Sequence, residues 1–294
     1  MTRSGRSLTL YRLRQYAVKG GMYVVLITLS LIALSPMYYA AINAFKTNEE
    51  YVENRFGLPQ NWTTVNFRYV YSIANLSQYL MNNLIVIPLA LISYLFVCCS
   101  AGFAFGLLRF RWKHLIFGLV LFFMIFPPML LAVPIYLICG KLHLISTRTG
   151  IILVWVAYFA PYGTYIMSTF FASVPRELIE SSRIDGANVL QMLVWVMMPV
   201  AKPMLATVSI IGFLSMWNEL PFSMLLLQKN AVRTFVLGIA MLKGEYGVTD
   251  PILSASVILG CLIPLAVFLF FQRYVTGGAL AGSGMGFLWF NAYP

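Results

Sequence analysis

The chain has 294 residues, of which 60% are hydrophobic and only 10% are charged, and its mean hydropathy is +0.81. An ordinary soluble domain carries about 25% charged residues, so this chain has too few charges to cover a globular surface that faces water. The composition therefore excludes an ordinary soluble protein and predicts a polytopic membrane protein.

The excess of basic residues gives the chain a net charge of +11. A nucleic-acid-binding protein would carry such charge on a soluble basic face, and no soluble domain is visible, so no nucleic-acid partner is expected. The four cysteines lie in or at the ends of apolar segments, and no pair of them has metal-ligand spacing with a histidine. The sequence therefore predicts no metal site.

Residues 1–21 form a basic tail, which is followed by an apolar stretch from Met22 to Phe45. The hydrophobic core of a signal peptide is about 7–15 residues long, and this stretch runs well beyond that length. We therefore expect an uncleaved first membrane span rather than a cleaved leader.

Six apolar segments are long enough to cross a bilayer, which takes roughly 20 residues per helix. Their apolar runs are continuous rather than alternating, and this favours helices over the strands of a barrel. The sequence thus predicts one all-α domain over residues 1–294 with six transmembrane helices, approximately Met22–Phe45, Met81–Leu108, Leu115–Cys139, Gly150–Ala172, Pro203–Leu227 and Ile252–Phe271.

The distribution of Lys and Arg predicts the orientation of these helices, because cytoplasmic loops are enriched in both residues. If the amino terminus is inside, the inner segments hold more of them than the outer segments. The basic tail and the compact turn Arg109-Phe110-Arg111-Trp112-Lys113 carry most of this signal. Both termini are therefore predicted to be cytoplasmic.

Two segments outside the spans differ in character. Residues 46–78 form the longest outer loop, which is expected to be either a small cap with short helices or a plain connector. Residues 276–294 contain many glycines and are predicted to form a flexible cytoplasmic tail.

Prolines interrupt several spans, and each removes a hydrogen bond from a helix. Pro127-Pro128 is predicted to break the third helix in its outer half, and Pro161 to break the fourth near its middle. Such breaks are tolerated where neighbouring helices or a cavity satisfy the freed backbone, so they support a moving pathway without establishing one.

No arrangement of residues typical of an active site is visible. The two histidines, His114 and His143, are predicted near opposite faces of the membrane and cannot act together. The chain contains no Gly-x4-Gly-Lys-[Ser/Thr] sequence, so it cannot bind ATP by a P-loop. No catalytic residue is predicted, and an enzyme is disfavoured.

Glu219, in the sequence Trp217-Asn218-Glu219, is the one acid embedded at the edge of a span. A helix rises 1.5 Å per residue, which places Glu219 roughly 24 Å from Pro203 and near the outer boundary of the bilayer core. A proton relay at the midplane is therefore disfavoured. Asn218 and Glu219 are candidates for lining a pathway across the membrane, and structural hydrogen bonding at a helix break before Pro221 is an equal alternative.

Residues 173–202 form a polar interruption between the fourth and fifth predicted spans. Glu177 and Glu180 lie near the positive end of a short first helix. Asp185-Gly186 is expected to end this helix, with Asp185 capping a second helix over residues 187–198. On this pattern alone the segment is either a docking site for a partner or an amphipathic connector.

The sequence Glu180-Ser181-Ser182-Arg183-Ile184-Asp185-Gly186-Ala187, followed by Met198-Pro199 and Pro203, closely resembles the cytoplasmic EAA loop of ABC importer permeases. The later Trp217-Asn218-Glu219 resembles the carbohydrate-uptake branch, similar to the maltose-system permeases. Ser181 and Ser182 stand where that motif usually has two alanines, a small-for-small change that adds hydroxyl groups. The resemblance extends over residues 20 to 286.

This resemblance implies that the short helix docks in a cleft on a separate ATPase subunit. It also implies a bacterial-type cytoplasmic (inner) membrane location, a second permease subunit in a heterodimer, two ATPase subunits that bind ATP and Mg²⁺, and an extracytoplasmic solute-binding protein. Membrane lipid is a further expected partner, and no cofactor is implied on this chain. The residues implied to form the coupling site are Glu177, Glu180, Ser181, Ser182, Arg183, Asp185, Gly186 and Ala187.

The resemblance further implies ATP-driven uptake of a carbohydrate by alternating access, with an oligosaccharide favoured. The alternative is the same machinery for another solute: a polyol, a glycerol phosphate or an acidic oligosaccharide of the alginate type. A secondary transporter or channel is less favoured, because neither intramembrane acids nor an internal repeat is visible.

Overall fold

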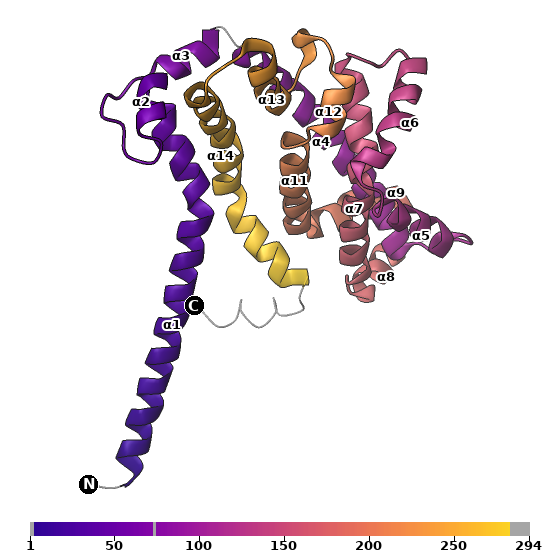
Figure 1. Ribbon diagram of the computed structural model, residues 1–294. Coiled ribbons are helices and arrows are strands. Elements are labelled where there is room, and N and C mark those ends of the chain that lie inside the picture. The colour runs from indigo at the N-terminus through magenta and orange to yellow at the C-terminus, as the bar shows by residue number, and fades with distance from the viewer. Residues whose placement is uncertain (1–2, 73–74, 283–294) are drawn as a thin grey trace. The chain divides into compact units, whose positions relative to one another are not determined.

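The computed structural model describes residues 3–72 and 75–282, and every regular element in these ranges is a helix (Figure 1). Contacts divide the described residues into two compact units, one formed by residues up to Val70 with Gly247–Ile258 and the other by Tyr71–Tyr246 with residues from Leu259 onward. The helices are α1 (Arg3–Ala44), α2 (Asn48–Glu53), α3 (Val65–Ser72), α4 (Leu76–Leu107), α5 (Lys113–Phe123), α6 (Pro128–Lys141), α7 (Arg148–Ala172), α8 (Arg176–Ile184), α9 (Val189–Gln191), the π-helical turn η1 (Met192–Met197), α10 (Met198–Val200), α11 (Lys202–Trp217), α12 (Pro221–Leu226), the 3-10 turn η2 (Asn230–Val232), α13 (Phe235–Tyr246) and α14 (Asp250–Gly282).

Four of the described helical segments are long and apolar enough to cross a membrane: Val18–Ala44 of α1, α4, α7 and Asp250–Gln272 of α14. Two more pairs pass the same test together but are bent, α5 with α6 by 102° and Val189–Val200 with α11 by 82°. The described residues thus hold six candidate spans if each bent pair counts as one. The predicted class, a helical polytopic membrane protein, is confirmed, and the orientation of its termini stays a prediction.

The third predicted span, Leu115–Cys139, is broken where its sequence predicts. α5 ends at Phe123 and α6 begins at Pro128, because Pro127-Pro128 supplies no amide hydrogens for a continuous helix. The predicted break at Pro161 is wrong, since α7 runs through this residue without interruption. A single proline removes one helix hydrogen bond, and the packing of α7 against α4 holds the remaining turns.

Two predicted boundaries are corrected. The fifth predicted span, Pro203–Leu227, does not form one helix, because α11 ends at Trp217 and α12 begins at Pro221. The predicted flexible tail, residues 276–294, is helical in its first part, since α14 continues to Gly282. Glycine in a helix costs only about 1 kcal/mol relative to alanine, so a few glycines weaken a helix without ending it. Residues 283–294 lie outside the described residues.

In the first unit, short helices follow α1. Asn66 of α3 is buried, and its Nδ2 donates to the carbonyl oxygens of Ala44 at 2.9 Å and Lys46 at 2.7 Å. The Lys46 side chain is buried as well and donates through Nζ to the carbonyl of Asn54 at 2.6 Å. Burial away from water lowers the pKa of Lys46. The described part of the segment 46–78 therefore contains packed short helices, and its role as an outer cap stays a prediction.

In the second unit, α4 and α7 pack along each other and form the centre of the core. Gly102 of α4 permits this close approach, because an added Cβ would lie 2.5 Å from the Cβ of Met167. Trp155 and Phe171 of α7 are fully buried. Figure 1 shows α5 and α8 near one end of this helix pair and α12 and α13 near the other.

Candidate functional site

The short helix α8 follows α7 almost directly and ends in a Schellman motif. The amide of Ala187 donates to the carbonyl of Ser182 at 3.0 Å, and the amide of Gly186 donates to the carbonyl of Arg183 at 3.0 Å. Gly186 has a φ of +80°, a left-handed conformation that glycine adopts without steric cost. An added Cβ there would meet nothing within 4 Å, so the turn needs glycine for its backbone and its outer side is open.

The prediction that Asp185 caps the second helix is wrong. Asp185 is the C-cap residue of α8, and Asn188 is the N-cap of α9. Asn188 and Gln191 form a capping box, in which the side chain of each accepts from the backbone amide of the other at 2.9 Å. The left-handed turn at Gly186 takes up the residues between the two caps and moves the second helix start to Val189.

The hydroxyl groups of Ser181 and Ser182 both return to the backbone of α8. Ser181 Oγ donates to the carbonyl of Leu178 at 3.2 Å, and Ser182 Oγ donates to the carbonyl of Ile179 at 2.8 Å. Ser181 is exposed, whereas Ser182 is only 6% exposed. Position 182 therefore faces the interior and position 181 faces outward, and neither hydroxyl lacks a partner.

Large apolar side chains are exposed beside this turn. Ile184 at the end of α8 is 86% exposed, Leu190 in α9 is 68% exposed, and Trp195 in η1 is 76% exposed. An apolar surface rimmed by polar residues marks an interaction site more often than a solvated face. Leu190 and Trp195 belong to Val189–Val200, one arm of a bent candidate span, so either lipid or a partner subunit would cover this surface.

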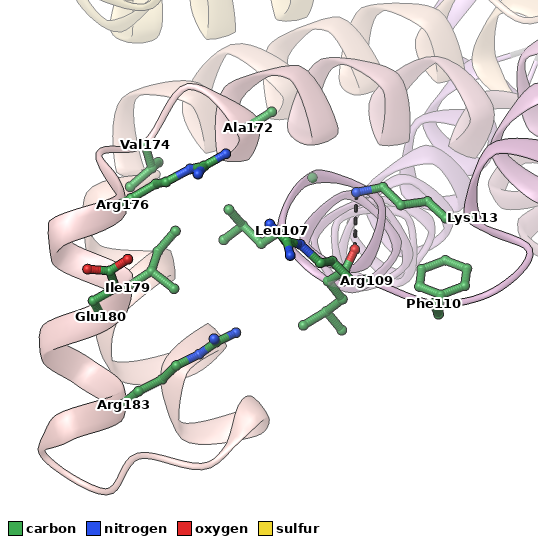
Figure 2. Close-up of a pocket in the computed structure, with 12 residues that line it drawn as sticks. Leu107, Arg109, Phe110, Lys113, Ala172, Val174, Arg176, Ile179, Glu180 and Arg183 are labelled. Carbon is green, nitrogen blue, oxygen red and sulfur yellow. Dashed lines mark hydrogen bonds between the residues drawn. The ribbon is translucent and has the colours of Figure 1, made fainter.

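A cavity of about 760 Å³, here called the arginine pocket, lies between α8 and the turn that joins α4 to α5. Figure 2 shows the side chains of Arg176 and Arg183 pointing from α8 into this space, with that of Arg109 approaching from the opposite wall. Lys113 also lines the pocket and donates to the carbonyl of Leu108 at 3.1 Å. Its complete lining is Gly106, Leu107, Leu108, Arg109, Phe110, Lys113, Ala172, Val174, Arg176, Ile179, Glu180 and Arg183.

Glu219 lies in the break between α11 and α12 and is 7% exposed. Its carboxylate accepts hydrogen bonds from Trp155 Nε1 at 2.9 Å, the amide of Phe222 at 2.6 Å, and the amide and hydroxyl of Ser223 at 3.0 and 2.8 Å. Asn218 is exposed and donates only to the carbonyl of Leu214 at 2.8 Å. The buried carboxylate therefore fastens the start of α12 to α7.

A second polar cluster, near the start of α4, was not predicted as a site. Asn82 accepts from Arg148 Nη2 at 2.7 Å and donates to the carbonyls of Ala231 and Arg233 at 2.9 Å. The guanidinium of Arg233 donates twice to the carboxylate of Glu245, at 2.6 and 2.7 Å. This hydrogen bonding lowers the pKa of Glu245 and raises that of Arg233. The cluster holds the segment from η2 to α13 against α4 and α7.

The structure brings the eight implied coupling residues together on α8 and its turn. Asn218 and Glu219 are separated from them by the whole of α11, whose 16 residues rise roughly 24 Å. Among the described residues, no group of three or more His, Cys, Asp or Glu could hold a metal ion. The arginine pocket was missed, because Arg109 and Lys113 were interpreted only as a signal of orientation.

Residues 99–277 match the family model described as the binding-protein-dependent transport system inner membrane component. This range includes α8, its Schellman turn and every residue that lines the arginine pocket. The chain belongs to this family. The resemblance to ABC importer permeases is thereby confirmed.

Relatives of this permease family match the chain over nearly its whole length. It is 29% identical over 263 residues to the diacetylchitobiose uptake system permease protein NgcG of Streptomyces coelicolor, with 89% of this chain and 87% of that protein covered. It is 28% identical over 262 residues to the arabinooligosaccharides transport system permease protein AraQ of Halalkalibacterium halodurans, with 88% and 93% covered.

The fold is also found in a solved structure. A chain in the crystal structure of a bacterial ABC transporter involved in import of the acidic polysaccharide alginate has a TM-score of 0.74 and 22% sequence identity. The match covers 93% of this chain and 98% of that one. At this identity the likeness establishes the fold and leaves the solute open.

Proposed function

We propose that this chain is the membrane-spanning permease subunit of an ATP-driven importer for an oligosaccharide. The observation that carries the proposal is the exposed turn after α8, where Gly186 has open space around it and Ile184 is 86% exposed. A turn so exposed and so well ordered by hydrogen bonds suits docking into a partner. The family match makes an ATPase subunit the natural partner.

The ATPase would act on this permease through α8. Glu180, Ser181 and Arg183 lie on this helix, and Asp185 and Gly186 form its turn. Because α8 follows α7 after only a short turn, a displacement of α8 passes directly to α7. The tight packing of α7 on α4 then moves both helices together. Closure of the ATPase dimer would in this way switch the pathway from inward-facing to outward-facing.

The remaining parts of the importer follow from the family. One chain with six spans would form half of the membrane pore, so a second permease subunit, most simply a different one, completes it. Two ATPase subunits bind ATP and Mg²⁺ on the cytoplasmic side and hydrolyse the ATP. A solute-binding protein delivers the solute on the other side. Two relatives named for the uptake of diacetylchitobiose and arabinooligosaccharides favour an oligosaccharide.

The test reconstitutes the permease pair with its ATPase and binding protein in vesicles and measures uptake beside ATP hydrolysis. We expect Gly186→Asp, or a bulky replacement of Glu180, to abolish uptake while the complex still assembles. Ser173→Ala, which changes an exposed hydroxyl outside α8, is the matched control and should keep both activities. Unchanged coupled uptake in Gly186→Asp would contradict the assignment of α8 as the coupling element.

A further inference from the structure

We propose that the arginine pocket binds the phosphate group of an anionic phospholipid from the surrounding membrane. This function goes beyond docking of the ATPase and beyond passage of the solute. It assigns a ligand to a cavity in which three arginine guanidinium groups have no partner among the described residues.

The charge of the lining points to an anion. Four basic side chains, Arg109, Lys113, Arg176 and Arg183, line the pocket, against the single acid Glu180. In the described part of the chain, no hydrogen bond or ion pair engages the guanidinium groups of Arg109, Arg176 or Arg183. Guanidinium groups bind phosphate oxygens through paired, charge-assisted hydrogen bonds. Three of them around one space therefore form a site for a phosphate group.

The position and the apolar part of the lining point to a lipid as the source of that phosphate. The pocket lies where two candidate spans end, at Leu107 of α4 and Ala172 of α7. Leu108, Phe110 and Val174 line it beside the arginines. Basic pockets between helix ends at the cytoplasmic surface are suited to anionic headgroups. A lipid would satisfy both parts of the lining, because its phosphate meets the arginines and its glycerol and upper acyl chains meet the apolar side chains.

The surface next to the pocket extends this apolar character. Trp112 and Leu115, at the start of α5, are each 57% exposed. Tryptophan is enriched at the boundary between headgroups and acyl chains, so this turn has the composition of a membrane interface. A cavity of about 760 Å³ also falls within the roughly 300–1,000 Å³ of ordinary small-molecule sites, which is more than a free phosphate fills.

An acidic segment of the ATPase is the alternative occupant, because Glu180 and Arg183 line the pocket and also belong to the proposed coupling site. The exposed apolar residues beside the turn, Ile184, Leu190 and Trp195, are not part of the pocket lining. The pocket instead opens between α8 and the α4–α5 turn, so its ligand bridges these two elements. A bound anionic lipid would thereby hold α8 in place from the membrane side and make coupling depend on lipid composition.

The test measures lipid binding to the full-length protein in detergent by native mass spectrometry. Phosphatidylglycerol is the anionic probe, phosphatidylcholine is the neutral probe, and inorganic phosphate is the soluble anion. We expect preferential binding of phosphatidylglycerol, weakened about fivefold by Arg109→Gln or Arg176→Gln alone and about 25-fold by the double variant. The paired Lys variants keep the charge, so they should retain most of the binding and exclude a folding defect.

Arg111→Gln is the matched control, because Arg111 lies in the same turn, stacks 5.5 Å over Trp112 and does not line the pocket. It should bind phosphatidylglycerol as the unchanged protein does. Equal binding by the double Gln variant would overturn the proposal. So would displacement of the lipid by an equal concentration of inorganic phosphate, which would indicate a free anion. If the double Gln variant no longer associates with the ATPase and the unchanged protein shows no preference for phosphatidylglycerol, the ligand is an acidic protein segment. That result would also overturn the proposal. None of these readouts requires transport, so they are independent of the proposed importer function.

Discussion

The two serines of α8 stand at positions where the family motif usually has alanines. Each hydroxyl donates to a carbonyl of its own helix, and such bonds can form wherever serine stands in a helix. The difference between the positions is burial, because Ser182 faces the interior and Ser181 faces outward. The size of residue 182 should therefore matter more than its hydroxyl group.

We expect Ser182→Ala to keep coupled uptake within about twofold, since an intramolecular hydrogen bond contributes only about 1 kcal/mol net. Ser182→Leu should reduce uptake several-fold, because overpacking a buried position costs about 1–3 kcal/mol and shifts α8. For both variants, uptake and ATP hydrolysis are measured in reconstituted vesicles. Equal uptake by the Ala and Leu variants would show that position 182 does not set the placement of α8.

Glu219 provides a second prediction at this scale. Glu219→Ala removes the acceptor for Trp155 Nε1 and for the amides of Phe222 and Ser223. Each buried donor left without a partner costs about 1–3 kcal/mol, so the melting temperature of the purified protein should fall by several degrees. Asn218→Ala is the neighbouring control, since Asn218 is exposed and bonds only to its own helix. A stable Glu219→Ala protein that has lost uptake would instead support a role in the pathway.

At the scale of elements, the turn after α8 depends on backbone conformation rather than on space. A non-glycine residue in the left-handed region costs about 1–2 kcal/mol, and asparagine tolerates it best. We therefore expect Gly186→Asn to keep most of the coupled uptake and Gly186→Val to lose it. Coupled uptake into vesicles is compared between Gly186→Asn and Gly186→Val, and assembly of the complex is measured for both as the control. Identical behaviour of Asn and Val would mean that the left-handed turn is not required.

The stability contributed by the ion pair between Arg233 and Glu245 of α13 should depend on pH. The hydrogen bonds from Arg233 hold the pKa of Glu245 below its ordinary value of 4.5, so their stabilisation is complete above that pH and is lost as the pH falls through the lowered pKa. Thermal unfolding of the purified protein between pH 3 and pH 7 should therefore show a smaller acid sensitivity in Glu245→Gln. Because Glu245 is partly exposed, the difference should be modest. An unchanged acid response would contradict a role for this ion pair.

The sequence predicted the elements whose signal is local. Continuous apolar runs indicated the spans, and Pro127-Pro128 indicated the bend between α5 and α6 because two consecutive residues lack amide hydrogens. The cap at Asp185 was predicted wrongly, since Asp185 and Asn188 are both good capping residues and only the left-handed turn at Gly186 decides between them. Local preference could not make that choice.

The parts of the site that depend on tertiary packing could not be predicted. Arg109 and Arg176 are far apart in the sequence and line one pocket only because α4 packs along α7. Trp155 likewise reaches Glu219 from another helix. The signal for both was present as charged or polar residues at the ends of spans, but the partner of each is specified by the packing of the helices.

At the scale of the whole molecule, the chain has the features of a subunit rather than of a complete transporter. It carries no P-loop sequence, and exposed apolar side chains lie beside its α8 turn. Its family consists of components of binding-protein-dependent systems. In the proposed importer, energy for transport therefore reaches the spans from another chain. This dependence on partners is the central claim of the account.

The most direct measurement is uptake of labelled oligosaccharides into vesicles that contain this chain with its second permease and its ATPase. We predict uptake that requires ATP inside, a functional ATPase and the binding protein outside, and that disappears when the ATPase is omitted. Uptake by this chain alone, driven by a proton gradient and indifferent to ATP, would contradict the account.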